Sequence, residues 1–361
     1  MQKDKITNGS GAAIAALTVM TNGYSMMFGA NAGRDAWISN LIAGGSAVVL
    51  AVCFTKVCDK YPQKNFFEIC TILFGTVLGK ISTAILALLS IMTCVVSLTA
   101  FSRFVQITAL AQTPQIILPL LIVIIAALSM RSGMIAASGS ARLLFWFSVA
   151  VFVAFTFFGV RDIDFSQLVP IGANASQILS GAGEIFLNRF GVVAALTAVY
   201  TRMRDEKTRR KFFLGGIGGA AVMLTVISAI TVATLGQTTA GADFYPVYTA
   251  MSVRGVGGFI RHTEILACIV MTLSLFFKCV VCLMFADDMQ CGIFDVRRRE
   301  GCVMPLALIS AASTQIIYQD ITSLRGMVEW KNGAWAVVVL YILIPVLLVL
   351  LSKIKGGNKL T

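Results

Sequence analysis

Long apolar runs separated by short polar stretches dominate the pattern of hydrophobic and polar positions along this chain of 361 residues. About 20 apolar residues are needed for a helix to cross the hydrocarbon core of a bilayer. We therefore predict ten membrane-spanning helices in two sets of five, at residues 11–30, 37–57, 81–102, 115–130 and 141–160, then 174–200, 212–235, 263–286, 302–318 and 334–352. The runs at 66–79 and 245–259 are shorter, and we interpret them as interfacial or re-entrant segments.

The composition supports an all-α integral membrane protein with a single membrane domain over residues 1–361. Hydrophobic residues make up 57% of the chain and charged residues only 13%, which leaves too little polar surface to coat a soluble globule. The net charge of +12 comes from short basic clusters between apolar runs, so we attribute it to membrane orientation and not to nucleic acid. Its bias predicts cytoplasmic N- and C-termini and a basic cytoplasmic loop at 202–211.

An odd number of spans in each set means that spans one and six leave from opposite sides of the membrane. Any internal repeat is then inverted, so we expect a five-plus-five inverted-repeat bundle of the transporter type. The first repeat covers residues 11–160 and the second covers 174–352. The start of the chain also resembles a signal peptide, with Lys3 and Lys5 before an apolar run, but its removal would destroy this symmetry.

In inverted-repeat transporters the first helix of each repeat is often broken near the membrane midplane, where free backbone groups bind a substrate or ion. Poor helix formers mark a candidate break in each set, namely Thr21, Asn22 and Gly23 in span one, and Ser180, Gly181 and Gly183 in span six. Glycine also allows close packing of membrane helices, and this alternative stays open.

Ionisable side chains inside apolar runs are costly and are therefore functional candidates. Glu184 follows the candidate break in span six, and Asn188 lies one turn later on the same face, where both could project into a central cavity. Glu184 could equally cap a new half-helix, and both interpretations stay open. Arg189 would pair with Glu184 only if the helix is distorted. Lys278, deep in span eight, is a possible ion or proton site, although we favour snorkelling toward the interface.

Enzymatic chemistry has little support in the sequence. The single histidine, His262, has no partner at metal-ligand spacing, and the sequence contains no P-loop, GxSxG or HExxH motif. The nine cysteines follow no zinc or disulfide spacing, and the pair Cys279 and Cys282 lies in an apolar run, so we interpret them as apolar fillers. We therefore predict a protein that is not an enzyme, with no cofactor.

Three acids near the end of span eight are a further candidate, for a divalent cation at the inner face: Asp287, Asp288 and Asp295. They precede three consecutive arginines, at 297–299. We favour the interpretation that these acids are solvated among the arginines, and we predict no metal site.

A series of short motifs resembles, in order and spacing, the spore germination permeases, which are the B subunits of germinant receptors. The motifs are Gly33-Arg34-Asp35-Ala36-Trp37-Ile38-Ser39, Leu78-Gly79-Lys80, Thr113-Pro114, Gly133 through Arg142, Val169-Pro170-Ile171, Gly183-Glu184, Tyr245-Pro246, and Ile260-Arg261 with Glu264. The resemblance covers nearly the whole chain. One departure is that span one lacks the proline expected after its break.

The resemblance implies the LeuT-like fold of the amino acid, polyamine and organocation transporters, with a ligand held between broken spans one and six. Carried onto this chain, the pocket falls at Thr21, Asn22, Gly23, Gly181, Gly183, Glu184 and Asn188. It further implies a germinant sensor in the inner membrane of the spore, which works with an A subunit and a lipoprotein C subunit. The expected germinant is a small polar molecule, an amino acid first of all.

Two other functions remain as alternatives at this point. One is an active secondary amino acid transporter coupled to an ion gradient. The other is a membrane scaffold or channel subunit without ligand specificity.

Overall fold

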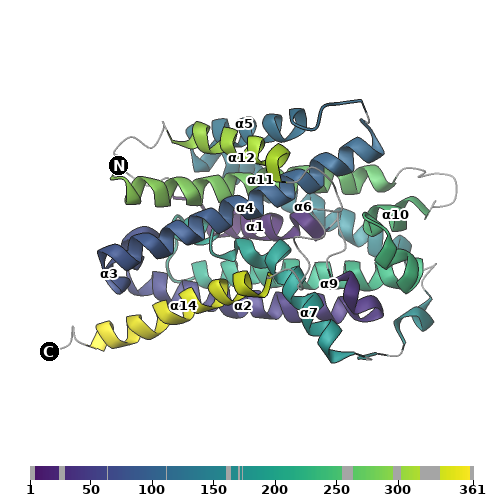
Figure 1. The fold of residues 1–361 in the computed structure, drawn as a ribbon, viewed down its shortest axis with the longest axis horizontal. Coiled ribbons are helices and arrows are strands. Elements are labelled where there is room, and N and C mark those ends of the chain that lie inside the picture. Colours follow the sequence, from purple (N-terminus) through teal and green to yellow (C-terminus); the bar gives the residue numbers. More distant parts are fainter. Residues whose placement is uncertain are drawn as a thin grey trace.

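Helices form almost every element of the computed structural model, which describes residues 5–23, 29–62, 64–110, 112–159, 164–169, 171–172, 174–253, 263–295, 302–317 and 334–357. In the first half these are α1 (Asn8–Met20), α2 (Ala36–Lys60), α3 (Phe66–Phe74), α4 (Thr76–Thr108), α5 (Ile117–Arg131) and α6 (Met134–Gly159) (Figure 1). The second half contains α7 (Ala175–Ile185), α8 (Thr197–Tyr200), α9 (Arg209–Ala242), α10 (Pro246–Val253), α11 (Thr263–Ile293), α12 (Val303–Ile317) and α14 (Ala334–Gly357).

Short 3-10 and π segments connect several of these helices. They are η1 (Thr21–Gly23), η2 (Ala30–Asp35), η4 (Phe165–Leu168), the π-helix η5 (Phe186–Phe190) and η6 (Gly191–Val193). The strand-like pairing in the described residues is one isolated parallel bridge between Ile6 and Met203. The all-α fold class is therefore confirmed.

The predicted spans all coincide with apolar helices. Seven helices of the described residues are long and apolar enough to cross a membrane: 31–60, 76–108, 137–157, 175–200, 209–242, 265–293 and 337–354. The other three predicted spans correspond to shorter apolar helices at 8–20, 117–131 and 303–316. Residues 24–28, which belong to the predicted span one, lie outside the described residues. The count of ten crossings and the division into two repeats stay predictions.

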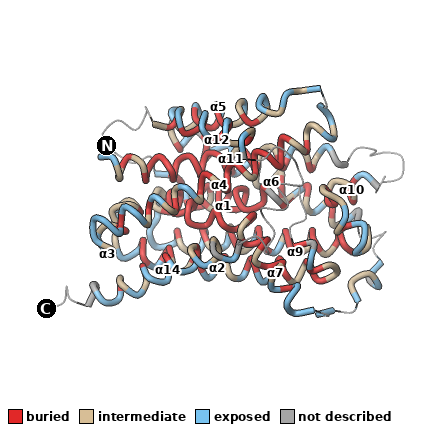
Figure 2. Tube along the Cα trace, in the orientation of Figure 1, coloured by how far each residue is buried: buried red, intermediate tan, exposed pale blue. Residues whose placement is uncertain are grey.

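The centre of the bundle is formed by α1 and α11. Nearly all residues of α1 are buried, and this helix packs against α6, α9 and α11. Figure 2 shows buried residues along these central helices and exposed residues on the outer sides of α5 and α14. Exposed apolar side chains such as Leu143, Phe157 and Leu350 are the surface expected to face lipid.

The predicted interfacial run 66–79 contains a separate short helix, α3. Asn65 and Glu68 form a capping box at its start, and Gly75, at φ +87°, separates it from α4. Only residues 76–79 of the run belong to the long helix α4. The second predicted interfacial run contains α10, and its residues 254–259 lie outside the described residues.

Basic and acidic side chains join several helices at the end of the bundle where α3 lies, at the left of Figure 1. We call this end of the bundle the basic end. The Arg209 guanidinium donates to Asp59 Oδ1 from Nη2 at 2.6 Å and from Nε at 3.0 Å. Tyr200 Oη donates to the same oxygen at 2.7 Å. The backbone of Ile6 pairs on both sides, because its N–H donates to Arg202 O and its carbonyl accepts from Arg204 N.

Two acids predicted to be solvated are buried at the same basic end. Asp287 is 5% exposed and Asp288 is 7% exposed, so the solvated interpretation is wrong for both, whereas Asp295 is exposed. Arg202 makes a salt bridge with Asp288 at 2.9 Å. Arginines 297–299 lie outside the described residues.

Candidate ligand-binding site

The helix of span one ends where the sequence predicted a break. The α-helix α1 stops at Met20, and Thr21, Asn22 and Gly23 form the 3-10 turn η1. A Cβ atom at Gly23 would lie 1.9 Å from Leu224 Cδ2 of α9, so the glycine permits a close approach of the two segments. The described backbone of Asn22 belongs to η1, and its side chain lies outside what the structure describes. The α-helix of span one therefore ends at the predicted position, and residues 24–28 beyond it lie outside the described residues.

The break in span six lies later in the chain than predicted. Gly181 and Gly183 are inside the regular helix α7, which runs to Ile185. The irregular part begins at Phe186 with the π-helix η5 and continues through the 3-10 turn η6. The predicted break at 180–183 is therefore wrong, because glycine lowers helix propensity but a surrounding bundle can hold it in a helix.

Gly181 allows close packing of helices, which was the alternative to a helix break at this position. A Cβ atom at this position would lie 3.1 Å from Ser39 Oγ and 3.3 Å from Gly29 Cα. Gly29 itself has φ +78°, a left-handed conformation that glycine adopts without strain. The two glycines thus bring the turn after span one against α7, one helical turn before the π-helix.

The two irregular segments meet in the interior of the bundle, where η1 packs against both η5 and α11. Thr21 Oγ1 lies 3.0 Å from the carbonyl oxygen of Ser274 in α11. Lys278, one turn further along α11, donates from Nζ to the carbonyl oxygen of Asn188 at 3.2 Å. A backbone carbonyl in the π-helix is thus bound by an ammonium group from a different span. We call Thr21, Asn188, Ser274 and Lys278, together with Glu184 one turn before Asn188, the central polar cluster.

Lys278 does not snorkel to the membrane interface. Its side chain is fully buried, and it lies near the middle of α11. The interpretation favoured from sequence is therefore wrong, because the Asn188 carbonyl gives the ammonium group a partner inside the bundle. A buried ionisable residue with a named partner at membrane depth is a functional candidate.

Glu184 is buried in the last turn of α7 and is 5% exposed. Its Oε1 accepts a hydrogen bond from Asn31 Nδ2 at 2.9 Å. Glu184 does not sit in the first turn of a helix, so the capping interpretation is wrong. Asn188 Nδ2 donates to the Glu184 carbonyl oxygen at 2.8 Å, so this amide binds its own helix.

Ser274 is a functional candidate that the sequence did not reveal, whereas Arg189 was named from the sequence without its partner Asn40. The Ser274 hydroxyl is fully buried and has no hydrogen-bond partner among the described residues. Arg189, 2% exposed, donates from Nη1 to Asn40 Oδ1 on α2 at 3.1 Å. A pair between Arg189 and Glu184 was expected only in a distorted helix. The π-helix is such a distortion, and within it Arg189 bonds to Asn40. A serine in an apolar run carries no sequence signal by itself, although the spacing of four from Lys278 places both on one face.

Comparison with known proteins identifies relatives along most of the chain. A profile of the spore permease family, described as spore germination protein, matches residues 12–323. Spore germination protein KB of Bacillus subtilis (strain 168) is 23% identical over 323 residues, which cover 88% of this chain and 84% of that protein.

Solved structures of similar fold include crystal structures of the Eremococcus coleocola manganese transporter. One of its mutants matches with a TM-score of 0.60 at 12% identity, and its complex with an aromatic bis-isothiourea compound matches with 0.61 at 14%. Each match covers 95% of this chain and 78% of the transporter. These identities show the fold alone, and that fold is the LeuT-like transporter bundle. The family match over residues 12–323 goes further and shows that this chain belongs to the spore permease family of spore germination proteins.

Proposed function

We propose that this chain is the germinant-sensing, permease-like B subunit of a spore germinant receptor, and that it binds an amino acid at the central polar cluster. The observation that carries this proposal is the meeting of two interrupted helices around Lys278. Interrupted helices expose backbone N–H and carbonyl groups at membrane depth, and inverted-repeat transporters use such groups to bind substrates. Membership of the spore permease family supports germination as the process.

The chemistry of the cluster suits a zwitterion. Lys278 and the Ser274 hydroxyl are donors for a carboxylate, whereas Glu184 and the carbonyls of the π-helix are acceptors for an ammonium group. A ligand that competes for Lys278 would change its bond to Asn188, and therefore the contact between α11 and the π-helix. Such a change transmits a signal only if the ligand prefers one arrangement of the bundle.

The proposed setting is the inner membrane of the spore, with both termini on the cytoplasmic side. The proposed partners are an A subunit and a lipoprotein C subunit, which would detect the arrangement of the bundle. Similarity to spore germination protein KB supports a place in a germinant receptor complex. Nothing in the proposal requires catalysis or a cofactor.

The first test is thermal unfolding of the detergent-purified chain against a panel of amino acids, nucleosides and sugars. A ligand that binds only the folded state raises the unfolding midpoint, and a concentration of 100 times Kd stabilises by about 2.7 kcal/mol. We expect a rise with one or more amino acids and loss of that rise in Glu184→Gln and Lys278→Met.

The matched control is Glu68→Gln, the same change at an exposed carboxylate of α3. This variant should keep the full ligand-induced shift. A shift that survives in both Glu184→Gln and Lys278→Met would remove the central polar cluster from the proposal. Parallel experiments with the reconstituted receptor complex would separate absence of binding from dependence on the partner subunits.

An active amino acid transporter is the second candidate, because the structures of similar fold belong to a transporter. It predicts accumulation of a labelled amino acid in proteoliposomes under an ion gradient, and loss of accumulation in Glu184→Gln. Binding without accumulation would favour the sensor. A scaffold or channel subunit predicts neither binding nor any effect of these substitutions on ligand-triggered responses.

A further inference from the structure

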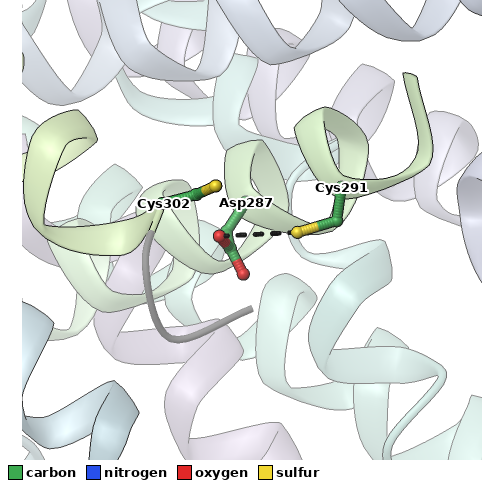
Figure 3. A group of neighbouring side chains, drawn as sticks. All are labelled: Asp287, Cys291 and Cys302. Atoms are coloured by element: carbon green, nitrogen blue, oxygen red, sulfur yellow. Dashed lines mark hydrogen bonds between the residues drawn. The ribbon is translucent and has the colours of Figure 1, made fainter. Parts of the chain in front are cut away.

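A cluster of one carboxylate and two thiols, drawn in Figure 3, lies next to Asp288 of the basic end. Asp287 and Cys291 are four residues apart near the end of α11, so they share one face of that helix. Cys302 directly precedes the first residue of α12. The carboxylate oxygen and the two sulfur atoms all lie within 4.8 Å of one another.

The cluster is enclosed by the protein. Asp287 is 5% exposed and Cys291 is 8% exposed, and Cys302 is half-buried. Cys291 Sγ lies 3.9 Å from Asp287 Oδ1. The neighbouring acid, Asp288, forms a salt bridge with Arg202. The two adjacent carboxylates of α11 therefore contact different groups.

These three ligand types select a class of cation. Sulfur ligands favour zinc and other thiophilic ions, whereas manganese and magnesium favour oxygen ligands. Zinc bonds of about 2.0 to 2.3 Å place the ligand atoms of a tetrahedral site about 3.3 to 3.8 Å from one another. Atoms already within 4.8 Å would therefore move by about an ångström or less to close around the ion.

We propose that Asp287, Cys291 and Cys302 bind a divalent cation of the zinc class, which joins the end of α11 to the start of α12. The fourth position of a tetrahedral ion is left for water or a further ligand. Such an ion acts as a clip across the connection between two spans. Its ligands reach the ion as thiolates and carboxylate, so binding releases thiol protons to solvent.

This site is separate from the proposed ligand-binding site. Asp287 follows Lys278 by nine residues, which at about 1.5 Å per residue places it about 14 Å further along α11. The cation proposal therefore stands whether or not the central polar cluster binds an amino acid. It also differs in ligand type from a site for manganese, a cation that prefers oxygen ligands.

Cobalt absorption tests the proposal directly. The purified full-length chain, kept reduced, is titrated with Co²⁺, which reports tetrahedral thiolate sites by sulfur-to-cobalt charge-transfer bands. We expect saturation at about one Co²⁺ per chain and loss of the bands when Zn²⁺ is added. Cys291→Ser and Cys302→Ser should each reduce the charge-transfer intensity by about half or more, because each removes one of two thiolates. Cys53→Ser, a half-buried thiol of α2, should leave the bands unchanged.

Asp287→Asn supplies a variant that keeps both thiols. It should retain the charge-transfer bands while its cobalt affinity falls at least about tenfold, the usual scale for losing a supporting group at a metal site. Bands that persist unchanged in both Cys291→Ser and Cys302→Ser would overturn the proposal. The proposal would also be overturned if the reduced chain takes up neither cobalt nor zinc. This holds even if Cys291 and Cys302 form a disulfide when the chain is oxidised.

Discussion

Two of the buried charged residues of this protein have hydrogen-bond partners far away in the sequence. The bond between Arg189 and Asn40 joins residues 149 positions apart, and the bond between Lys278 and Asn188 joins residues 90 positions apart. Sequence reasoning singled out Lys278 and Asn188 because polar groups inside apolar runs are conspicuous. It assigned no partner to either, because partners depend on how the helices pack.

Asn40 tests how much a single acceptor contributes to the buried charge of Arg189. Replacing Asn40 by Ala removes the oxygen that accepts from Arg189 Nη1 and the amide that donates to Ser228 Oγ, and we expect a loss of about 1 to 3 kcal/mol in the free energy of unfolding. Thermal unfolding in detergent measures the change. Asn40→Asp keeps an acceptor at the same place and should retain most of the wild-type stability. Equal destabilisation by both substitutions would show that the acceptor is not what matters.

At the scale of elements, the apolar pattern was enough to locate the helices. Every predicted span coincides with an apolar helix, because burial in lipid requires continuous apolar runs and helical hydrogen bonding. The break in span one was also predicted, from three consecutive poor helix formers. The break in span six was displaced by one to two turns, because the π-helix contains Phe186, Leu187 and Phe190, residues with no breaking signal of their own. The π-helix packs against α2, α4 and η1, which the sequence pattern does not reveal.

The contact between α1 and α9 depends on a glycine that the pattern did not mark. A Cβ atom at Gly216 would lie 2.5 Å from the backbone carbonyl oxygen of Ala12, whereas one at Gly215 would meet nothing within 4 Å. We expect Gly216→Ala to destabilise by about 1 to 3 kcal/mol, because the two helix backbones must separate. Gly215→Ala, in the same turn, should be neutral or slightly stabilising. Similar unfolding midpoints for the two variants would contradict the close approach.

For the whole molecule, family and fold followed from the combination of short motifs, span count and order. The candidate ligand-binding site could be predicted less well from the sequence, since Ser274 was missed and Gly181 proved to be a packing residue. The structure adds the connections that close the basic end. They join α2 to α9, the loop after α8 to α11, and α2 to α14 through Lys60, which donates to the Ser352 carbonyl oxygen.

Closure of the basic end can be tested through Asp59. Asp59→Asn removes the charge bound by Arg209, and we expect local opening to become easier by about 1 to 2 kcal/mol, or about five- to thirtyfold. Amide hydrogen exchange around residues 5–8 and 202–205 measures this opening. The control is Glu68→Gln, which removes an exposed ion pair with Lys64 and should leave exchange at these amides unchanged. Exchange that stays at the wild-type rate in Asp59→Asn would show that the Asp59 charge does not hold the basic end closed.

That backbone bridge has a consequence for how the chain is made. Ile6 leaves the ribosome before its partner Met203, which follows 197 positions later (203 − 6). At about 5 to 20 residues per second, synthesis takes about 10 to 40 s to deliver the partner. The segment around Ile6 must therefore remain without this partner until the residues up to Met203 have been synthesised. The basic end closes late in biogenesis, and a shortened chain that stops before Met203 would never close it.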